Sequence, residues 1–580
     1  MIISYQKAKF VVECSYSENA LITNLPSKRY DRRRDMWVAQ NLNRNCKFLL
    51  ENLRQYLTDE ALLVCEETVA KTRVSYLDFP INYVFKTQPF VKQKEALNHA
   101  YNLRRNAFFM RMGTGKTKTA IDLYTCRLLE GKVDVVLVVC PSNLKENWLR
   151  EVGIHCPVED MPVHVVEAGP RASKSAEIFA SKHDTYYLVV GVESLSVGVS
   201  KGTAWEAVVS AIYNKKIGLI VDESHMCKGH DSTRSKNVKQ LGSFAKYMSI
   251  MTGTPTTQGP VDLYMQFEIL DPNILGFGDY YSFRNRYCVM GGYENKQIVT
   301  YQNVDELTEL ISPVVYQCDK DADMPPKTYT MISCEMSKEQ KEAYKSIDQE
   351  MKLILPSNPT SADLAIFVEH AVTKYGILQQ ITGGFINYDD PEQPILKRDA
   401  DGNETVKYKR KASVLVDPMV NPKIAEIIRI AREESERSII IWAKYRKEIE
   451  MISGALRNEF GDDAVAEYHG GLDRNSRTES VDNFNGGHSR FFVSNQQSGG
   501  VGLNLVVSDL AIFYSNSFKL LDREQSEDRI HRIGQKSDNV LYIDLVCNNT
   551  KDGEVLEALE KKQDLATFIK NSLYAIQNDH

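Results

Sequence analysis

Short apolar runs alternate with longer segments of helical periodicity along most of the chain. The runs that we expect to form buried strands cover residues 106–110, 134–140, 185–190, 216–221, 247–251, 438–443, 491–494, 510–515 and 540–546. Helical patterns such as residues 118–129 separate them, and this alternation predicts parallel sheets with helices on both faces. We therefore expect an α/β fold with two parallel-sheet lobes, at residues 81–325 and 326–580.

Residues 1–80 carry a different pattern, which predicts a small α+β module in front of the first lobe. The pattern favours strands at residues 5–14, 20–25 and 36–42, a basic turn-rich link at 26–35 and an amphipathic helix at 46–57. Within the second lobe we expect an insertion at residues 338–420. It consists of helical protrusions at 338–351 and 362–375 and a hairpin at 395–411 that turns at 399–403.

Composition and charge are those of an ordinary globular protein. The 580 residues include 43% hydrophobic and 26% charged residues, and the net charge is −6, so a nucleic-acid partner requires a local basic surface. None of the 11 cysteines forms a C-x-x-C pair, and the apolar runs are too short to cross a bilayer. We expect the protein to have no membrane partner. We expect its location to be the cytoplasm, in a bacterial or viral context, or the nucleus if the source is a eukaryote.

The N-terminal module supplies a local excess of positive charge. Residues 1–57 contain ten Lys and Arg against five Asp and Glu, and the densest cluster includes Arg29, Arg32 and Arg33 near Trp37. Basic residues interleaved with aromatic ones can hold a phosphate backbone and stack on exposed bases. A solvated charged loop with Trp37 in a small core is an equally good interpretation at this point.

A glycine-rich turn lies between the strand pattern at residues 106–110 and the helical pattern that follows. Its residues are Met112, Gly113, Thr114, Gly115, Lys116 and Thr117. In a phosphate-binding loop, glycines let successive backbone N–H groups point at phosphate oxygens, and the following helix adds its positive end. Lys116 would reach the β- and γ-phosphates of ATP, and Thr117 would offer its hydroxyl to Mg²⁺. Met110 stands where the general pattern has glycine, and the alternative is a glycine turn with a surface lysine.

Polar residues follow two more strands of the first lobe. Asp222 and Glu223 follow the run at 216–221, where Asp222 suits a Mg²⁺ contact and Glu223 suits orienting and deprotonating the attacking water. Thr252, Gly253 and Thr254 follow the run at 247–251, and short hydroxyl side chains there can hydrogen-bond the acidic pair and couple nucleotide state to movement.

Residues outside these strand ends complete the nucleotide site that we expect in the first lobe. Gln93, upstream of the loop, can read the adenine edge with its amide. His225, Cys227 and His230 lie close together in the sequence but lack a fourth ligand, so we expect no metal site there.

The second lobe has no phosphate loop of its own and instead carries paired arginines. Arg529 and Arg532 are three residues apart, on a helix that we expect to end at Gly534. On one helix face they would act as arginine fingers, which stabilise the charge of a phosphoryl transition state. The alternative is that they pair with Glu527 or Asp528 on the helix surface.

Taken together, these motifs resemble the Swi/Snf-like branch of helicase superfamily two, over about residues 85–550. The motifs are Gln93, 112–117, 140–148, 222–225, 252–255, 498–505 and 528–535. The resemblance implies two RecA-like lobes and nucleic-acid-dependent ATP hydrolysis. It also implies a DNA track lined by Pro141, Ser142, Thr252, Ser494, Gly499 and Gly500. A nucleotide contact at Gly502 and a coupling role for Gly253, Thr254 and Gln525 follow from it as well. Ser224 and Arg111 depart from the residues that are usual in this branch.

A second, shorter resemblance concerns the N-terminal module. The string from Leu25 to Asp31, followed by Trp37 and a Leu-rich helix, resembles the HARP module of annealing helicases. This resemblance covers some 35 residues and implies recognition of branched or junction DNA.

The hypothesis that unites these motifs is an ATP- and Mg²⁺-dependent translocase on double-stranded DNA. It would act as a monomer to remodel branched DNA or to displace a protein bound to DNA. A strand-separating helicase on DNA or RNA is the main alternative, with residues 395–411 as the candidate pin. An ATP-gated DNA clamp needs neither Glu223 nor the arginines, and a small-molecule P-loop kinase does not account for the second lobe.

Overall fold

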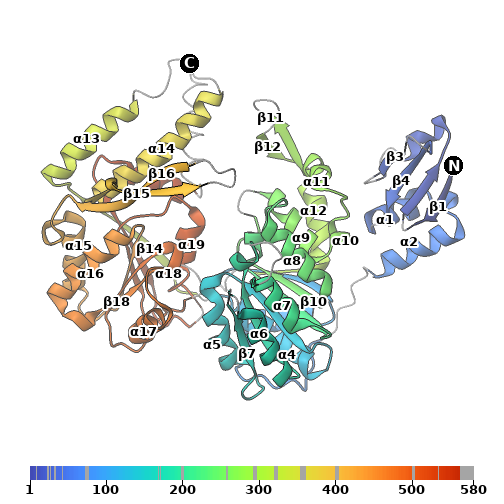
Figure 1. Cartoon of the computed structure of the whole chain (residues 1–580), viewed down its shortest axis with the longest axis horizontal. Helices are drawn as coiled ribbons and strands as arrows, with labels where there is room; N and C mark the ends of the chain where they lie inside the picture. Colours follow the sequence, from blue (N-terminus) through green and yellow to red (C-terminus); the bar gives the residue numbers. More distant parts are fainter. Residues whose placement is uncertain are drawn as a thin grey trace. The chain divides into compact units, whose positions relative to one another are not determined.

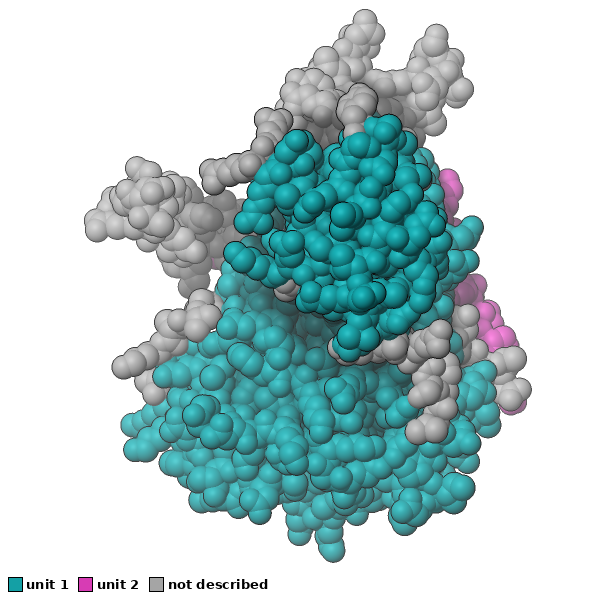
Figure 2. Space-filling model, turned by 90° about the vertical axis from the view of Figure 1, so that its right-hand side faces the viewer, with its two compact units in different colours: residues 1–320 teal, residues 321–580 magenta. Residues whose placement is uncertain are grey.

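The computed structural model forms two compact units, Met1–Lys320 and Asp321–His580 (Figures 1 and 2). It describes residues 1–561 with short gaps. The gaps are residues 8, 23–24, 26–27, 32–33, 42, 72–77, 168, 170, 197–201, 257–258, 292–296, 319–323, 353–360, 399–403, 500–502 and 533. No described helix combines the length and the apolar character that a membrane crossing needs.

The first unit is built on a seven-stranded sheet in which every pairing is parallel. Its strands, in spatial order, are β13 (Val315–Cys318), β5 (Arg105–Met110), β10 (Ala245–Met251), β9 (Ile217–Asp222), β6 (Val135–Cys140), β8 (Tyr186–Gly191) and β7 (Val163–Val166). The central strands are buried at every position, which explains why their sequences read as continuous apolar runs. The strands expected at 106–110, 134–140, 185–190, 216–221 and 247–251 are confirmed to within a few residues.

Helices cover both faces of this sheet, as the alternating pattern predicts (Figure 1). One face packs against the helices α6 (Ala172–Lys182), α7 (Ala204–Ile212), α8 (Thr233–Phe244) and α9 (Leu263–Leu270). The other face is covered by helices that include α4 (Lys116–Leu129), whose Tyr124 hydroxyl donates to the carbonyl of Leu219 in β9. The strand ends that carry the predicted site are thereby fixed by a closely packed core.

The N-terminal residues of the same unit form an antiparallel sheet in the order β1 (Ile2–Gln6), β2 (Lys9–Glu13), β4 (Met36–Gln40) and β3 (Lys28–Asp31). The helices α1 (Asn43–Asn52) and α2 (Asp59–Lys71) pack against it. The strand at 36–42 and a helix in the region 46–57 are confirmed.

Three expectations for this module are wrong. The expected strand at 5–14 covers parts of two strands, β1 and β2, the expected strand at 20–25 overlaps the 3₁₀ helix Tyr16–Ile22, and the expected link contains β3. Apolar spacing over five or six residues does not distinguish a strand from a 3₁₀ turn, and basic residues can occupy an edge strand such as β3.

The second unit contains a six-stranded sheet, again with parallel pairing throughout. Its order is β14 (Lys327–Cys334), β21 (Val540–Cys547), β20 (Leu510–Phe513), β17 (Ile439–Ala443), β19 (Phe491–Asn495) and β18 (Val465–Tyr468). Helices α15 (Pro422–Glu433) and α16 (Arg446–Phe460) cover one face, and α17 (Arg474–Asn485) covers the other. The prediction of two RecA-like parallel-sheet lobes is therefore confirmed. The finer division into domains at residues 80 and 325 stays a prediction.

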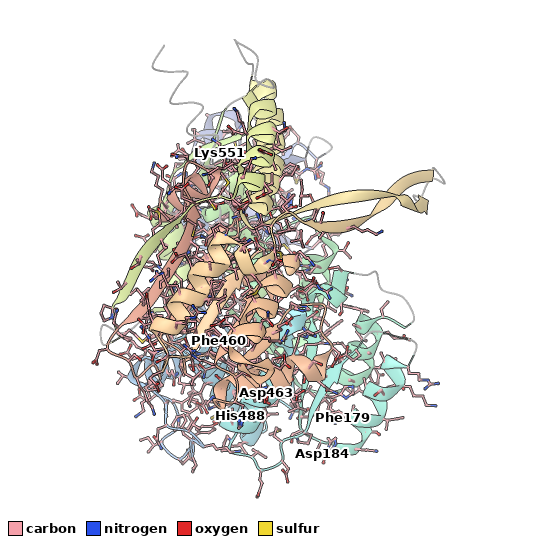
Figure 3. The ribbon with its side chains drawn as sticks, turned by 90° about the vertical axis from the view of Figure 1, so that its left-hand side faces the viewer. Phe179, Asp184, Phe460, Asp463, His488 and Lys551 are labelled. Carbon is pink, nitrogen blue, oxygen red and sulfur yellow. The ribbon has the colours of Figure 1, made fainter. Side chains whose placement is uncertain are left out.

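The predicted insertion of the second unit consists of two helices and a hairpin. The helices are α13 (Lys338–Lys352) and α14 (Ser361–Thr382), and the hairpin pairs β15 (Phe385–Arg398) with β16 (Glu404–Val414). The hairpin is longer than the expected 395–411, and its two strands extend away from the sheet of their own unit (Figure 3). The expected turn at 399–403 lies outside the described residues.

Candidate active site

The glycine-rich loop follows β5 and ends in the first turn of α4. Gly113 and Gly115 have φ angles of 81° and 85°, a left-handed conformation that glycine adopts at little cost. A Cβ atom on Gly115 would lie 2.0 Å from Gln93 Nε2, so this position accepts no side chain. Lys116 Nζ donates to the carbonyl of Met110 at 3.0 Å, and the Lys116 side chain is buried. Thr117 lies in the first turn of α4.

Gln93 packs against this loop and is hydrogen-bonded to it. It lies in α3 (Val91–Ala100) and is 2% exposed. Its Nε2 donates to the carbonyl of Thr114 at 3.1 Å, and its Oε1 accepts from the backbone N–H of Phe90. Both ends of the amide are therefore bonded inside the protein, and its contact with adenine stays a prediction.

The acidic pair lies at the carboxyl end of β9, two strands from β5 in the sheet. Asp222 and Glu223 are 6% and 8% exposed, and burial of two adjacent carboxylates requires compensating partners. Burial and the neighbouring charge of Glu223 raise the pKa of Asp222. Burial would also raise the pKa of Glu223, but the hydrogen bond from His225 and the positive charge of Lys116 outweigh it and lower that pKa. Glu223 is thus the member of the pair that is held ionised.

Thr252, at the carboxyl end of β10, is hydrogen-bonded to the acidic pair. Its hydroxyl donates to Glu223 Oε2 at 3.1 Å, lies 2.9 Å from His225 Nδ1 and accepts from the backbone N–H of Thr254 at 3.1 Å. A Cβ atom on the neighbouring Gly253 would lie 3.1 Å from the backbone N of Met112 in the phosphate loop and 3.4 Å from Lys116 Nζ, so this position lies against the loop. The structure therefore brings Lys116, the acidic pair and Thr252 together.

Trp148 is a site residue that the sequence reasoning missed. It lies in α5 (Lys145–His155), is fully buried, and its Nε1 donates to Asp222 Oδ2 at 2.9 Å. The only signal in the sequence was its place at the end of the 140–148 motif, because the two residues are 74 positions apart.

The predicted DNA-track residue Ser142 has a partner that was equally unforeseen. Its backbone N–H and its hydroxyl both donate to Glu193 Oε2, at 2.9 and 2.6 Å. Glu193 belongs to the 3₁₀ helix Val192–Ser196, which follows β8, and Pro141 and Ser142 follow β6. Both residues thus lie at the same edge of the sheet as the acidic pair.

In the second unit, Arg529 and Arg532 follow the helix α19 (Leu520–Glu527) rather than lying on it, which corrects the prediction of a helix ending at Gly534. They nevertheless converge, because Nη1 atoms of both donate to the carbonyl of Leu503, at 3.1 and 3.4 Å. Arg529 Nε also donates to the carbonyl of Gln525. Glu527, one of the two acidic residues in the alternative interpretation, is bound to Arg523 and Lys327, and pairing of the arginines with Asp528 stays an alternative.

Ser494 and Gly499 lie together at the carboxyl end of β19. A Cβ atom on Gly499 would come within 2.3 Å of Ser494 Oγ and 2.8 Å of the Trp442 ring, so only glycine fits there. Gly500 and Gly502 lie outside the described residues, and their roles stay predictions.

In the N-terminal module, Trp37 is half-buried and Arg29 is exposed on the edge strand β3. The Trp37 indole donates to Asn19 at 2.8 Å and lies under the ammonium of Lys28. This side chain therefore has a structural role, and the exposed surface beside it is formed by Arg29 and Tyr30. Arg32 and Arg33 lie outside the described residues.

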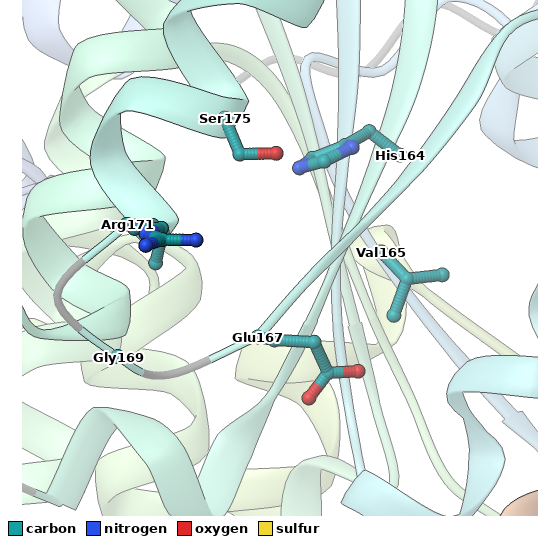
Figure 4. A pocket seen from close by; sticks show the side chains of 7 residues that line it. His164, Val165, Glu167, Gly169, Arg171 and Ser175 are labelled. Carbon is teal, nitrogen blue, oxygen red and sulfur yellow. The ribbon is translucent and has the colours of Figure 1, made fainter.

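A cavity of about 390 Å³ lies between β7 and α6 in the first unit. His164, Glu167, Arg171 and Ser175 surround it (Figure 4). No predicted site residue lines it, so it is separate from the strand ends that carry the acidic pair.

Comparisons with known proteins agree with these motifs. Residues 92–380 match the family described as "SNF2-related domain", and residues 422–534 match "Helicase conserved C-terminal domain". A similar curated protein is "Protein CHROMATIN REMODELING 4" of Arabidopsis thaliana, 24% identical over 498 residues, or 82% of this chain and 21% of that protein. Another is "ATP-dependent helicase fft3" of Schizosaccharomyces pombe, 22% identical over 484 residues, or 74% of this chain and 51% of that protein.

The chain thus spans from about a fifth to a half of the length of these relatives. Among solved structures, a "Sulfolobus solfataricus SWI2/SNF2 ATPase core in complex with dsDNA" is similar at 20% identity. That similarity covers 84% of this chain and 93% of the other, with a TM-score of 0.36.

Proposed function

The chain belongs to the Swi/Snf-like, SNF2-related family of helicase ATPases, and from this premise we propose that it is a nucleic-acid-dependent ATPase that moves along double-stranded DNA. Its work on DNA is the remodelling of branched DNA or the displacement of bound protein. The observation that carries the proposal is the convergence of Lys116, Glu223 and Thr252 at one edge of the first sheet, next to Asp222.

The roles follow from the contacts. Lys116, which now donates to the carbonyl of Met110, would exchange that bond for the phosphates of ATP, together with the backbone N–H groups of the loop. Glu223 is held ionised, which suits a carboxylate that accepts a hydrogen bond from the attacking water and orients it. Thr252 keeps the Glu223 carboxylate in one orientation through its hydroxyl.

The oxygen groups of Thr117 and Asp222 would be the protein ligands of a magnesium ion. Thr117 and Asp222 offer hydroxyl and carboxylate oxygens, which are the ligands that Mg²⁺ prefers. Bound there with ATP, Mg²⁺ would neutralise phosphate charge. Asp222 is already oriented without it, since Oδ1 accepts from the backbone N–H of Glu223 and Oδ2 accepts from Trp148.

The remaining predicted roles belong to this proposal as well. Arg529 and Arg532 would stabilise the charge of the phosphoryl transition state, for which their shared contact with Leu503 holds them together. Ser142, exposed at the end of β6, offers a hydroxyl and a backbone N–H, which are groups that commonly bind DNA phosphates. Arg29 on the edge of the N-terminal sheet offers a cation for the same kind of contact.

One observation favours a second candidate function, a strand-separating helicase. The hairpin β15–β16 extends from the second unit as a two-stranded arm (Figure 3), a shape that could hold separated DNA strands apart. The 30 residues from β15 to β16 contain six acidic and six basic residues. Because the hairpin has no net charge, it has no overall electrostatic attraction for a phosphate backbone. Its charge therefore does not add support to the second candidate.

Steady-state ATP hydrolysis tests the proposal. The rate is measured without nucleic acid and with single-stranded DNA, duplex DNA, forked DNA or RNA, with Lys116→Ala as the blank. We expect the strongest stimulation by duplex and forked DNA. Stimulation by single strands or RNA alone would favour the strand-separating helicase. A rate that no nucleic acid changes would contradict both and leave an ATP-gated clamp.

A further inference from the structure

The segment that follows β6 is attached to its neighbours at two separate points. At its start, the backbone N–H and hydroxyl of Ser142 donate to the Glu193 carboxylate. Six residues later, the Trp148 indole donates to the Asp222 carboxylate. The residues between them form the 3₁₀ helix Ser142–Leu144 and the first turn of α5, so the two attachment points belong to one continuous helical segment.

The first attachment is exposed and the second is buried. Ser142 is open to solvent and Glu193 is partly so, whereas Trp148 and Asp222 are 0% and 6% exposed. A DNA phosphate approaching this edge of the sheet would therefore meet Ser142 and could not reach Trp148.

The Glu193 carboxylate is hydrogen-bonded to the two groups of Ser142, its backbone N–H and its hydroxyl, that would bind a phosphate. Hydroxyls and backbone N–H groups are standard phosphate ligands, and a carboxylate that accepts from both resembles a phosphate in charge and in acceptor geometry. A phosphate at Ser142 would also lie beside the negative charge of Glu193. Binding of DNA there therefore requires Glu193 to release Ser142, and this release frees the outer end of the segment to move.

We propose that Trp148 is a positioning residue that couples phosphate binding at Ser142 to the carboxylate of Asp222. Release of Ser142 shifts the helical segment. Trp148 lies in the first turn of α5 and moves with the segment, so its indole N–H changes the orientation of the Asp222 carboxylate. The inference rests on the proposed function, because it assumes that duplex DNA and ATP bind to the same lobe.

Coupling of this kind is reciprocal. If duplex DNA changes the affinity for nucleotide by a given factor, nucleotide must change the affinity for duplex by the same factor. A measurement of DNA binding therefore reports the coupling without any hydrolysis, which separates it from a simple loss of catalysis.

The test uses the full chain with Trp148→Phe, and Trp205→Phe as the matched control. Trp205 lies in α7 of the same unit. It is buried in the hydrophobic core between the sheet and the helices that cover it. Phenylalanine keeps an aromatic ring at position 148 and removes the N–H donor. For each protein, the duplex Kd is measured by fluorescence anisotropy with and without a non-hydrolysable ATP analogue, and the stimulation of ATP hydrolysis by duplex is measured in parallel.

We expect the analogue to change the duplex Kd of the wild type and of Trp205→Phe by at least about fivefold, a typical lower value for allosteric coupling. In Trp148→Phe this factor should fall to within about twofold of unity, a loss within the range measured for residues along coupling networks. The stimulation ratio should fall with it. An unchanged factor in Trp148→Phe, with the wild type stimulated by duplex, would overturn the inference and leave the proposed function intact.

A second variant tests the outer attachment without altering the core. Glu193→Gln keeps acceptors for Ser142 but removes the charge, and neutral hydrogen bonds are roughly half as strong as charge-assisted ones. The duplex concentration that gives half-maximal stimulation should therefore fall, by at least about threefold. An unchanged or higher concentration would show that Glu193 does not compete with phosphate and would overturn the inference. A wild type that duplex does not stimulate would instead contradict the proposed function itself.

Discussion

Replacing Thr252 by valine tests whether one hydroxyl holds the acidic site together. Valine has nearly the same shape as threonine, so the change removes the hydroxyl and little else. Thr252 is fully buried, and its hydroxyl bonds Glu223, His225 and the backbone N–H of Thr254. Because the position is shielded from solvent, the three partners cannot replace the lost bonds with bonds to bulk water.

The magnitude follows from these contacts. A buried polar group left without a partner costs about 1–3 kcal/mol, and more when it is charged. Glu223 and His225 retain each other, with Nδ1 and Oε2 3.2 Å apart, so the penalty is smaller than three independent losses would give. We expect Thr252→Val to lower the free energy of unfolding of the first unit by about 2–3 kcal/mol.

The same loop supplies a matched control. The hydroxyl of Thr254 is buried and has no hydrogen-bond partner among the described residues, so Thr254→Val should change the free energy of unfolding by less than about 0.5 kcal/mol. Urea unfolding followed by far-ultraviolet circular dichroism compares the two variants. Equal stabilities for Thr252→Val and Thr254→Val would refute the claim that the Thr252 hydroxyl organises the site.

Three further predictions concern single side chains. Lys116→Ala should lower the rate of ATP hydrolysis by at least about a hundredfold, because it removes the cation that stabilises phosphate charge. The rate is measured by phosphate release, and a rate within about tenfold of wild type would contradict this prediction. Arg523→Met should destabilise the second unit by about 3–5 kcal/mol in urea unfolding, because the buried carboxylate of Asp544 loses the cation to which it is bound and Glu527 keeps only Lys327. A loss below about 1 kcal/mol would contradict this. Burial raises the pKa of Glu448 from its ordinary 4.5 to about 7, so the folded state retains a proton that the unfolded state releases. The stability from this group is complete below pH 4.5 and is lost as the pH rises through about 7. Wild type should therefore lose about 3 kcal/mol relative to Glu448→Gln over this interval, and parallel stability curves would contradict the argument.

The central strands of both lobes could be predicted because they are buried on both faces, whereas the edge strands β7, β13 and β14 are partly exposed and were not among the expected runs. Burial on both faces requires a continuous apolar run, and β6 and β9 show such runs. The N-terminal module was predicted less well, since its strands are short and half-exposed. The region expected to be a strand at 20–25 contains the end of a 3₁₀ helix, and β3 consists of the polar residues Lys28–Asp31.

Within the site, the residue types were predictable but their partners were not. Lys116, Asp222 and Glu223 belong to local motifs that the chemistry of phosphate binding requires at fixed spacing. The bond between Trp148 and Asp222 joins positions 74 residues apart, and no local pattern encodes such a contact. The same holds for Ser142 and Glu193, which are 51 residues apart.

Movement along intact duplex DNA is the central claim, and displacement of a third strand tests it most directly. A labelled oligonucleotide is bound as a triplex to one end of a duplex, and its release is followed after ATP is added, with Lys116→Ala and a non-hydrolysable ATP analogue as controls. We predict that ATP releases the third strand while the duplex remains paired, and that neither control does so. Hydrolysis stimulated by duplex DNA without release of the third strand, or release that occurs only when the duplex is unwound, would contradict the account.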